Sequence, residues 1–437
     1  MTHIPFNLGL FASFGPPAWQ APDDRLNGGD WWTGEFLVDV ARRAEAAKFD
    51  FIFFEDTSTV TTVLGGSMDA DLKNNIYAPK QDPLQLLPLL AGATEHLGLI
   101  ATASTTFYPP WILARLFSTL DSISSGRSGW NIVTSADSEA ALNFGMDDLP
   151  DHATRYAMAD DFLDVTKKLW GAWEPGAVVR DLASNTYIDP SKVRHVDHEG
   201  PFFKVRGPLN TVPSPQGHPL LVQAGSSPRG RDFSAKHSEL IFAPTEGGVA
   251  GMKAFRDDIR ERAAKFDRNP DDIKIIFASF PLFLPEGVTL ADLPEPTDDE
   301  LIYSMAFLSA TLDTDLSQFD LNEPLPADLT PRGHTGLFVE MQEAGKRGQS
   351  LRDSIKAFRE GNGLSLVGTP EEVAEQMAAA IDEVGGDGFM IITSNMLTAE
   401  YLDNITNRLV PALQKLGVTR TEYVEGATLR EQLGQIR

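Results

Sequence analysis

Short apolar runs, many of them β-branched, alternate along the chain with longer segments in which apolar residues recur at helical spacing. Phe36, Val40 and Ala44 show this spacing after the first run, and charged residues lie between them. Repeated alternation of this kind predicts βα units, with helices covering a parallel sheet. Eight runs, the number that closes a TIM (β/α)8 barrel, fall at residues 6–11, 51–55, 98–103, 129–134, 220–224, 240–243, 273–284 and 388–393. We therefore expect an α/β fold in which residues 1–437 form a single barrel domain.

Two segments are too long to be simple connections between a strand and a helix. Residues 136–219 contain a helical pattern at about 155–173, followed by a stretch rich in Gly, Pro and His. Residues 285–363 are interrupted repeatedly by prolines, Pro331 among them. Because long insertions at the C-terminal face of a barrel commonly cover its site, we expect 285–363 to form a partly mobile lid.

Charge and composition exclude several classes of function. The chain has 37 Lys and Arg against 62 Asp and Glu, and its net charge of −25 argues against binding to nucleic acids or anionic membranes. It has no cysteine, which excludes disulfides, thiolate metal sites and a cysteine nucleophile. The first residues do not resemble a signal peptide, and no apolar run approaches the ~20 residues needed to span a bilayer. We expect a cytoplasmic protein.

Polar side chains occur at the ends of several expected strands, where ligands bind to a parallel barrel. Asp56 directly follows the second strand, Thr102 lies near the end of the third, and Asn131 lies in the fourth. Their carboxylate, hydroxyl and amide groups suit the hydrogen-bonding edge of one planar ligand. The residues alone leave a plainer alternative open, because loop acids often cap turns and hydroxyls are common in strands.

A second group of residues predicts an anion site. Ser226 and Ser227 follow the fifth strand and precede a helix, so hydroxyls, backbone N–H groups and the helix dipole would converge on a phosphate. His152 and Tyr156 are four residues apart and share one face of a helix that begins at Asp151. By themselves, such residues are more often a helix N-cap and a surface contact. The chain has neither a P-loop nor a strand-associated G-x-G-x-x-G.

One loop contains a cluster of residue types that bind zinc or manganese. The cluster consists of His195, Asp197, His198 and Glu199. These residues lie between glycines and prolines rather than on a helix or at a strand end. We therefore expect no metal site.

Several motifs, in this order along the chain, resemble those of one enzyme superfamily. They are Ser-Gly-Arg-Ser-Gly-Trp-Asn-Ile-Val-Thr-Ser at 125–135, Ala-Leu-Asn-Phe-Gly at 141–145, Asp-His-Ala-Thr-Arg-Tyr at 151–156, Val-Asp-His-Glu-Gly at 196–200 and Gln-Ala-Gly-Ser-Ser-Pro-Arg-Gly at 223–230. In these motifs the chain is similar to the flavin-dependent monooxygenases of the bacterial-luciferase superfamily. The most similar branch contains nitrilotriacetate, dibenzothiophene-sulfone, pristinamycin and long-chain alkane monooxygenases. The match runs nearly end to end and is weakest between about 285 and 360.

The resemblance implies the oxygenase component of a two-component FMN-dependent monooxygenase. In such a system a separate NAD(P)H:flavin reductase supplies reduced FMN, and O2 forms a flavin 4a-hydroperoxide that oxygenates a small organic substrate. The matching positions place Asp56 and Thr102 at the flavin, and His152 and Tyr156 at its phosphate and ribityl oxygens. With Asn131, Ser226 and Ser227 they make up the expected cofactor site. No catalytic residue is assigned.

Two other functions stay open at this point. Deazaflavin-dependent dehydrogenases of the same superfamily share the barrel and transfer hydride. A barrel that binds flavin without turnover is not excluded by any local feature. In each case we expect a homo-oligomer, either a dimer or a tetramer.

The chain departs from its relatives just before Trp19. Many of them carry a Gly-His-His-like segment there, whereas this chain has Phe-Gly-Pro-Pro-Ala at 14–18. The two prolines stiffen the loop, and no imidazole remains to bind or protonate a substrate. We therefore expect a neutral or aromatic substrate rather than a polycarboxylate.

Overall fold

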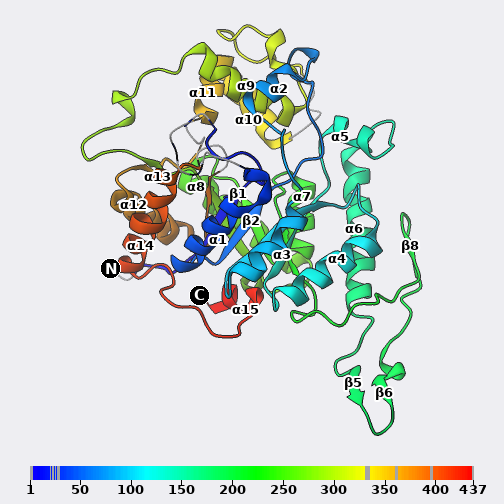
Figure 1. Ribbon diagram of the computed structural model, residues 1–437. Coiled ribbons are helices and arrows are strands. Elements are labelled where there is room, and N and C mark those ends of the chain that lie inside the picture. The colour runs from blue at the N-terminus through cyan, green and yellow to red at the C-terminus, as the bar shows by residue number, and fades with distance from the viewer. Residues whose placement is uncertain are drawn as a thin grey trace.

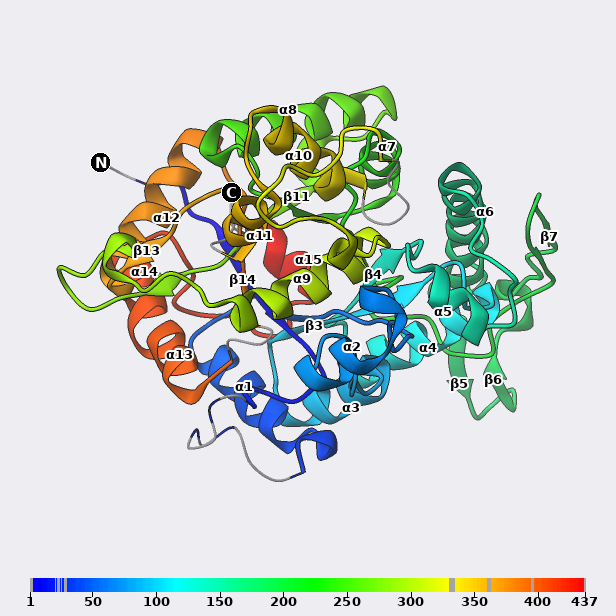
Figure 2. The same cartoon turned by 90° about the horizontal axis from the view of Figure 1, so that it is seen from above.

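Parallel strands close a barrel, as the alternating pattern predicts (Figures 1 and 2). The computed structural model describes residues 3–19, 21, 24, 26, 30–329, 335–359, 363–393 and 397–435. The strands neighbour one another in the order β1-β14-β11-β10-β9-β4-β3-β2. Their bounds are β1 (Asn7–Ala12), β2 (Phe51–Phe54), β3 (Gly98–Ser104), β4 (Ser128–Val133), β9 (Leu220–Gln223), β10 (Leu240–Ala243), β11 (Lys274–Ser279) and β14 (Gly388–Ile392).

The structure divides one of the expected strands, the run at 273–284. β11 ends at Ser279, and the separate strand β12 (Leu282–Phe283) pairs with β13 (Val367–Gly368) outside the barrel. Pro281 lies between the two strands and has no backbone N–H to donate to a neighbour. A single run of apolar residues therefore covers two elements.

Helices follow the strands and surround the barrel (Figure 2). They are α1 (Glu35–Ala46), α3 (Pro83–Ala93), α4 (Pro110–Ile123), α6 (His152–Trp170), α7 (Pro228–His237), α8 (Gly248–Lys265), α12 (Pro370–Val384), α13 (Ala399–Asn404) and α14 (Val410–Leu416). Each buries an apolar stripe against the strands, as Leu113 and Phe117 of α4 do. No helix of the described residues combines the length and apolar character needed to cross a membrane.

Apolar side chains fill the interior of the barrel. Successive strand residues alternate in direction, so Ile100 points inward with Thr102, whereas Ala101 packs with the outer layer. The interior cluster consists of Phe51, Phe53, Ile100, Leu220, Val222, Leu240, Ile276 and Met390, with Leu429 and Leu433 from the C-terminal helix. These side chains leave polar groups only at the two ends of the barrel.

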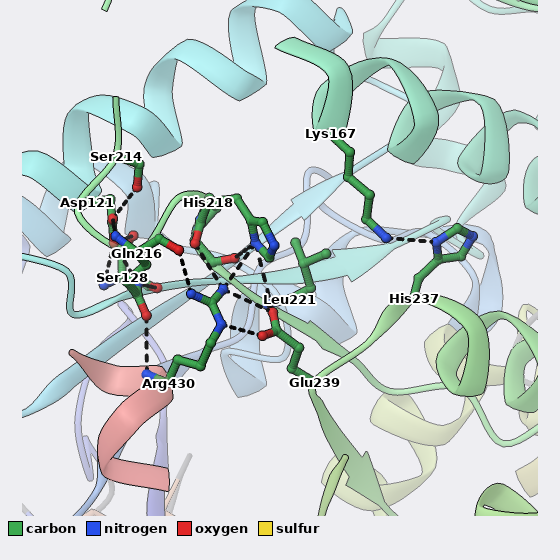
Figure 3. A network of polar contacts seen from close by, with 11 residues as sticks. Asp121, Ser128, Lys167, Ser214, Gln216, His218, Leu221, His237, Glu239 and Arg430 are labelled. Carbon is green, nitrogen blue, oxygen red and sulfur yellow. Dashed lines mark hydrogen bonds and ion pairs between the residues drawn. The ribbon is translucent and has the colours of Figure 1, made fainter. Parts of the chain in front are cut away.

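The C-terminal helix α15 (Leu429–Gln435) closes the N-terminal end of the barrel (Figure 1). Arg430 anchors it by donating hydrogen bonds to the carbonyls of Gln216 (2.7 Å) and His218 (3.0 Å) and by pairing with Glu239 (Figure 3). Leu429 is fully buried in the interior cluster. The end opposite the expected site is therefore sealed by the protein itself.

The two long insertions form separate layers (Figure 1). The first contains α5 (Ser138–Asn143) and, beyond α6, two hairpins that extend away from the barrel. The hairpin strands are β5 (Val178–Asp181), β6 (Thr186–Ile188), β7 (His198–Glu199) and β8 (Lys204–Val205). The second lies over the barrel mouth and has its own buried cluster, which includes Leu308, Phe338 and Leu351. Its helices are α9 (Asp298–Leu312), α10 (Thr335–Lys346) and α11 (Leu351–Arg359), and α2 (Asp69–Asn74) packs against α9. Pro331 lies outside the described residues, and the expected mobility of this segment stays a prediction.

Candidate functional site

A cavity of about 490 Å³ lies at the C-terminal ends of β1 to β4 and β9. This volume is in the range of small-molecule binding sites. Its walls come from the loop after β2, the first turn of α6, the loop between β9 and α7, and helix α9 of the second insertion. The expected cofactor residues that line it are Asp56, Thr102, His152, Tyr156, Ser226 and Ser227. Asn131 is not on its wall.

The N-termini of α6 and α7 meet at one end of the cavity. Asp151 caps α6, so the helix begins at His152, one residue after the expected start. Ser227 caps α7 by accepting a hydrogen bond from the backbone N–H of Gly230 (3.0 Å), and its Oγ lies 3.4 Å from His152 Nε2. Capping and ligand binding are compatible, because the Ser227 hydroxyl can accept from the helix and still donate its own hydrogen.

Tyr156 is held from three sides at the same end. Its ring lies 4.9 Å from the His152 ring, and the Arg229 guanidinium lies 5.2 Å from its centre on the ring face. The side chain of Gln223 donates a hydrogen bond of 3.5 Å to the phenol oxygen. Burial raises the pKa of Tyr156, so the phenol stays neutral and can donate to an anion.

Gly230 leaves the space that this arrangement needs. A Cβ at Gly230 would lie 2.7 Å from the phenol oxygen of Tyr156 and 3.1 Å from Ser227 Oγ. Real side chains do not tolerate the first of these contacts, and Tyr156 is too well packed to withdraw. The last glycine of the motif at 223–230 therefore allows α7 to approach α6 closely enough for both N-termini to face one ligand.

Arg155 is a candidate that the sequence analysis did not select. It lies in the first turn of α6, lines the cavity and is 6% exposed. One terminal nitrogen donates to the Pro150 carbonyl (2.5 Å), Nε has no hydrogen-bond partner, and no carboxylate among the described residues forms an ion pair with it. Burial lowers the pKa of Arg155. A buried guanidinium that forms no direct ion pair, with only the more distant Asp151 carboxylate to attract it, suits a phosphate. Its signal in the sequence was the arginine in the motif at 151–156.

Thr102 and Asn131 lie together at the floor of the cavity. Thr102 donates a hydrogen bond to the Phe54 carbonyl (2.8 Å) and accepts one from the Asn131 amide (2.9 Å). Asn131 is buried, and its amide oxygen has no partner among the described residues. Asn131 thus positions Thr102, and its direct contact with a cofactor stays a prediction.

Three carboxylates line the other end of the cavity, those of Glu55, Asp56 and Asp137. Lys80 is paired with Glu55 through contacts of 2.8 and 2.6 Å. Burial raises the pKa of Asp56 to about 7, because the loss of water outweighs the attraction of Lys80. Burial also raises the pKa of Asp137. One of its carboxylate oxygens caps α5, and the other has no hydrogen-bond partner among the described residues. This end is therefore acidic.

Helix α9 of the second insertion forms the roof over the acidic end. Phe307 and Thr311 line the cavity, and Thr311 Oγ1 lies 3.2 Å from the Tyr77 hydroxyl. The rings of Phe307 and Tyr77 lie 6.0 Å apart, and Ser138 donates a hydrogen bond of 3.1 Å to Asp313 just beyond α9. The sequence analysis missed these residues because they fall largely where the family resemblance is weakest.

The histidine-containing loop of the first insertion lies away from the cavity. His195 contacts a backbone carbonyl at 2.9 Å, and His198 Nε2 lies 2.9 Å from an Asp161 carboxylate oxygen. Asp161, Asp164 and His198 are close enough to share an ion. However, the Lys168 ammonium lies 3.2 Å from His198 Nδ1, where it would repel a cation. We assign no metal to this group.

Phe14 contributes less to the site than its position in the sequence suggests. It is 7% exposed, packs edge-on against the Trp31 ring at 6.2 Å, and does not line the cavity. Ser13 lines the cavity instead. The unusual segment at 14–18 therefore affects the site through its backbone path and not through a Phe14 side chain.

A sequence profile of the luciferase-like monooxygenases matches residues 7–388. The chain belongs to this family. The match covers every barrel strand but the last four residues of β14, together with all the cavity residues named above.

Full-length relatives support the family assignment. The chain is 37% identical to nitrilotriacetate monooxygenase component A of Aminobacter aminovorans, over 92% of this chain and 90% of that protein. It is also 37% identical to the long-chain alkane monooxygenase of Geobacillus thermodenitrificans, over 98% and 92%. The structure of a riboflavin lyase with a modified FMN and riboflavin superposes with a TM-score of 0.84 at 31% identity, over 99% of this chain and 96% of that chain. The luciferase-like monooxygenase described here is thus a flavin-dependent oxidoreductase.

Replacing Asp56 with Asn should change how stability depends on pH. The pKa of Asp56 is about 7 in the folded protein against an ordinary value of 3.8. An acid whose pKa rises on folding stabilises the fold when protonated; this contribution is full below pH 3.8 and is lost as the pH rises through about 7. Between pH 3.8 and about 7 the Tm of the wild type should therefore fall relative to that of Asp56→Asn. Above about pH 7 the difference between the two Tm values should stay constant. Glu375→Gln, on the exposed face of α12, is the control. Identical pH profiles for wild type and Asp56→Asn would contradict the raised pKa.

Proposed function

We propose that this protein is the oxygenase component of a two-component monooxygenase that uses reduced FMN and O2. The observation that carries the proposal is a cavity at the barrel mouth, between an end with Arg155, Tyr156 and Ser227 and an acidic end roofed by α9. When bound, reduced FMN supplies the electrons that activate O2, so that one oxygen atom enters the substrate, the other leaves as water and the flavin is oxidised. The protein's own residues bind the cofactor, orient it toward the substrate and shield both from water.

The anion-binding end holds the phosphate in this proposal. Arg155 supplies the charge, Tyr156 and Ser227 supply hydroxyl donors, and the N-terminus of α7 adds its dipole. Burial and nearby arginines lower the pKa of His152, so its ring is neutral and can accept as well as donate a hydrogen bond. A phosphate bound there would point the flavin ring toward Thr102 and Asp56.

The roof keeps water from the reacting end. Thr311 of α9 contacts Tyr77, and Asp313 just beyond α9 accepts a hydrogen bond from Ser138, so the roof is tied to the walls of the cavity. An apolar, closed pocket favours transfer of oxygen to the substrate over release of hydrogen peroxide. We propose that residues 285–363 are the lid expected from the sequence, and that opening of these contacts admits the substrate.

The supply of reduced FMN comes from outside the chain in this proposal. The sequence has no strand-associated dinucleotide fingerprint, so a separate NAD(P)H:flavin reductase is the expected source. The cytoplasm, where NAD(P)H is available, is the compartment we propose. Relatives that match nearly the whole chain are monooxygenases, which favours this function over the dehydrogenase and non-catalytic alternatives.

The substrate should be neutral or aromatic. Apart from Arg155 at the phosphate end, Lys80 is the only cationic residue among the described residues that line the cavity, and Glu55 neutralises it. Asp56, with a pKa of about 7, carries a negative charge above neutral pH, and Asp137 adds a second acidic group to the substrate end. A polycarboxylate would be repelled there, whereas Phe307 and neighbouring apolar groups offer contacts to an uncharged ring or chain.

Reduced FMN, not NADH, should be the reductant that the isolated protein uses. With reduced FMN supplied by an added reductase, NADH and O2 should be consumed and an oxygenated product should accumulate. Stopped-flow mixing with O2 should show that the protein delays the return of oxidised-flavin absorbance relative to free reduced FMN. Rapid NADH oxidation without reductase, or reoxidation at the same rate with and without protein, would overturn the proposed function.

Flavin affinity should identify the phosphate end. Ser227→Asp keeps a good N-cap but places a negative charge beside the phosphate, so it should weaken FMN binding most. Arg155→Gln should weaken the free energy of FMN binding by about 1.5–3 kcal/mol, and Tyr156→Phe should weaken it by about 0.5–1.5 kcal/mol. Anaerobic titration of reduced FMN measures all three dissociation constants. Arg408→Gln, whose guanidinium pairs with Glu371 of α12 outside the cavity, is the control. Unchanged affinity in the three cavity variants would mean that the phosphate lies elsewhere.

The charge of the substrate should decide turnover. For the wild type, kcat/KM should be at least about tenfold higher for a neutral compound such as dibenzothiophene sulfone than for nitrilotriacetate, since about 1.4 kcal/mol of repulsion suffices for this ratio. Asp137→Asn keeps the α5 cap but removes one carboxylate. It should therefore raise kcat/KM for nitrilotriacetate and bring the ratio of the two kcat/KM values closer to one. Comparable kcat/KM values for both compounds in the wild type would contradict the neutral-substrate proposal.

A further inference from the structure

Helices α6 and α7 pack against each other, and both begin at the end of the cavity that Tyr156 and Ser227 line. The groups proposed to hold the phosphate are divided between the two helices, with Arg155 and Tyr156 on α6 and Ser227 at the start of α7. These groups can meet one phosphate only if the helices keep a fixed separation. The contacts that hold α7 beside α6 therefore bear directly on cofactor binding.

One carboxylate of α6 bridges both ends of α7. Asp160 lies one turn beyond Tyr156, and one of its oxygens pairs with Arg229 in the first turn of α7. Its other oxygen accepts hydrogen bonds from His237 Nε2 (2.7 Å) and Lys236 Nζ (3.0 Å) in the last turn of the same helix. Asp160 therefore holds α7 at two points along its length.

The other acids of α6 face away from α7. Asp161 accepts hydrogen bonds of 2.9 Å from the two backbone N–H groups at 202–203, in the first insertion. Asp164 pairs with Lys168 of its own helix at 2.6 Å. Among the described residues, which include all of both helices, Asp160 is the one acid of α6 that forms an ion pair with α7.

Arg229 extends this restraint to the cavity wall. Its guanidinium lies over the Tyr156 ring, 5.2 Å from the ring centre, and donates a hydrogen bond of 3.2 Å to the Tyr156 backbone carbonyl. Asp160 is the one carboxylate among the described residues that pairs with Arg229. The side chain that supports one face of the Tyr156 ring is therefore oriented by Asp160.

The histidine in this group has a fixed orientation. Lys167, also on α6, lies 3.2 Å from His237 Nδ1 (Figure 3). An ammonium group can only donate, so Nδ1 accepts and Nε2 carries the hydrogen that Asp160 accepts. Burial lowers the pKa of His237, which keeps the ring in this neutral form. Burial alone would raise the pKa of Asp160, but hydrogen bonds from His237, Lys236 and Arg229 hold it well below its usual range, so the carboxylate stays charged.

We propose that Asp160 is a positioning residue for the cofactor phosphate: by binding both ends of α7 it keeps the N-termini of α6 and α7 at the separation that one phosphate spans. This inference rests on the proposed function, because it requires a phosphate between the two helices. Asp160 does not line the cavity, so it acts through Arg229 and α7 and not by contact with the ligand. It should therefore govern how tightly a phosphate-bearing flavin binds.

The affinities for reduced FMN and reduced riboflavin test this role, because riboflavin has the same ring and ribityl chain but no phosphate. In anaerobic titrations the wild type should prefer FMN. Asp160→Ala should weaken FMN binding at least about tenfold, which corresponds to about 1.4 kcal/mol, and riboflavin binding less than about twofold. Asp160→Asn keeps one acceptor oxygen and should lie between the wild type and Asp160→Ala. Asp164→Ala, on the same helix, is the control and should keep the wild-type preference.

Comparing the two flavins also separates the role of Asp160 from the proposed function. A wild type that binds FMN and riboflavin equally would overturn both the phosphate site and the role of Asp160. If the wild type prefers FMN and Asp160→Ala keeps the same preference, the role of Asp160 is wrong and the proposed function stands. Equal weakening of both flavins in Asp160→Ala would mean that Asp160 only stabilises the fold, and would also overturn its positioning role.

A double-mutant cycle tests the route through Arg229. Because Asp160 orients Arg229, the variant that combines Asp160→Ala with Arg229→Gln should lose less FMN affinity than the product of the two single fold-changes. At saturating reduced FMN, kcat should stay within about twofold of the wild type in all three variants, since neither side chain lines the cavity. A combined loss equal to the product, or a kcat that falls in proportion to FMN affinity, would overturn the positioning role.

Discussion

The closed apolar interior of the barrel is the constraint on which the site depends. Phe51, Ile100 and Met390 fill the interior, and Leu429 seals the N-terminal end. Polar side chains on the strands can therefore reach a ligand only at the opposite end. The interior layer also excludes water from the floor of the cavity, where Thr102 and Asn131 lie. Hydrogen bonds there are stronger than in water, and a polar group without a partner there destabilises the fold. The position of the cavity follows from this division.

The cavity is electrostatically polarised along its length. Arg155 and the N-terminus of α7 make one end attractive to anions, while Asp56 and Asp137 make the other end acidic. An elongated ligand with one phosphate can satisfy both ends in a single orientation only. In the function proposed above, this polarity would fix the direction of the cofactor before any substrate enters, which is the prior positioning on which catalysis by proximity depends.

The sequence was sufficient for the barrel, which follows from local patterns. It also named six residues that line the cavity, four of them through the family resemblance. Apolar runs that alternate with helical segments predicted the strands, and N-cap residues predicted where α6 and α7 begin. Pro281 shows the limit of apolar runs, because a missing N–H splits a run that looks continuous. Arg155 could not be singled out, because its value lies in burial without a carboxylate partner, which only the packed chain determines. The roof residues of α9 could not be predicted for a related reason. They line the cavity only because the insertion folds over the barrel mouth, which the sequence of the insertion alone does not indicate.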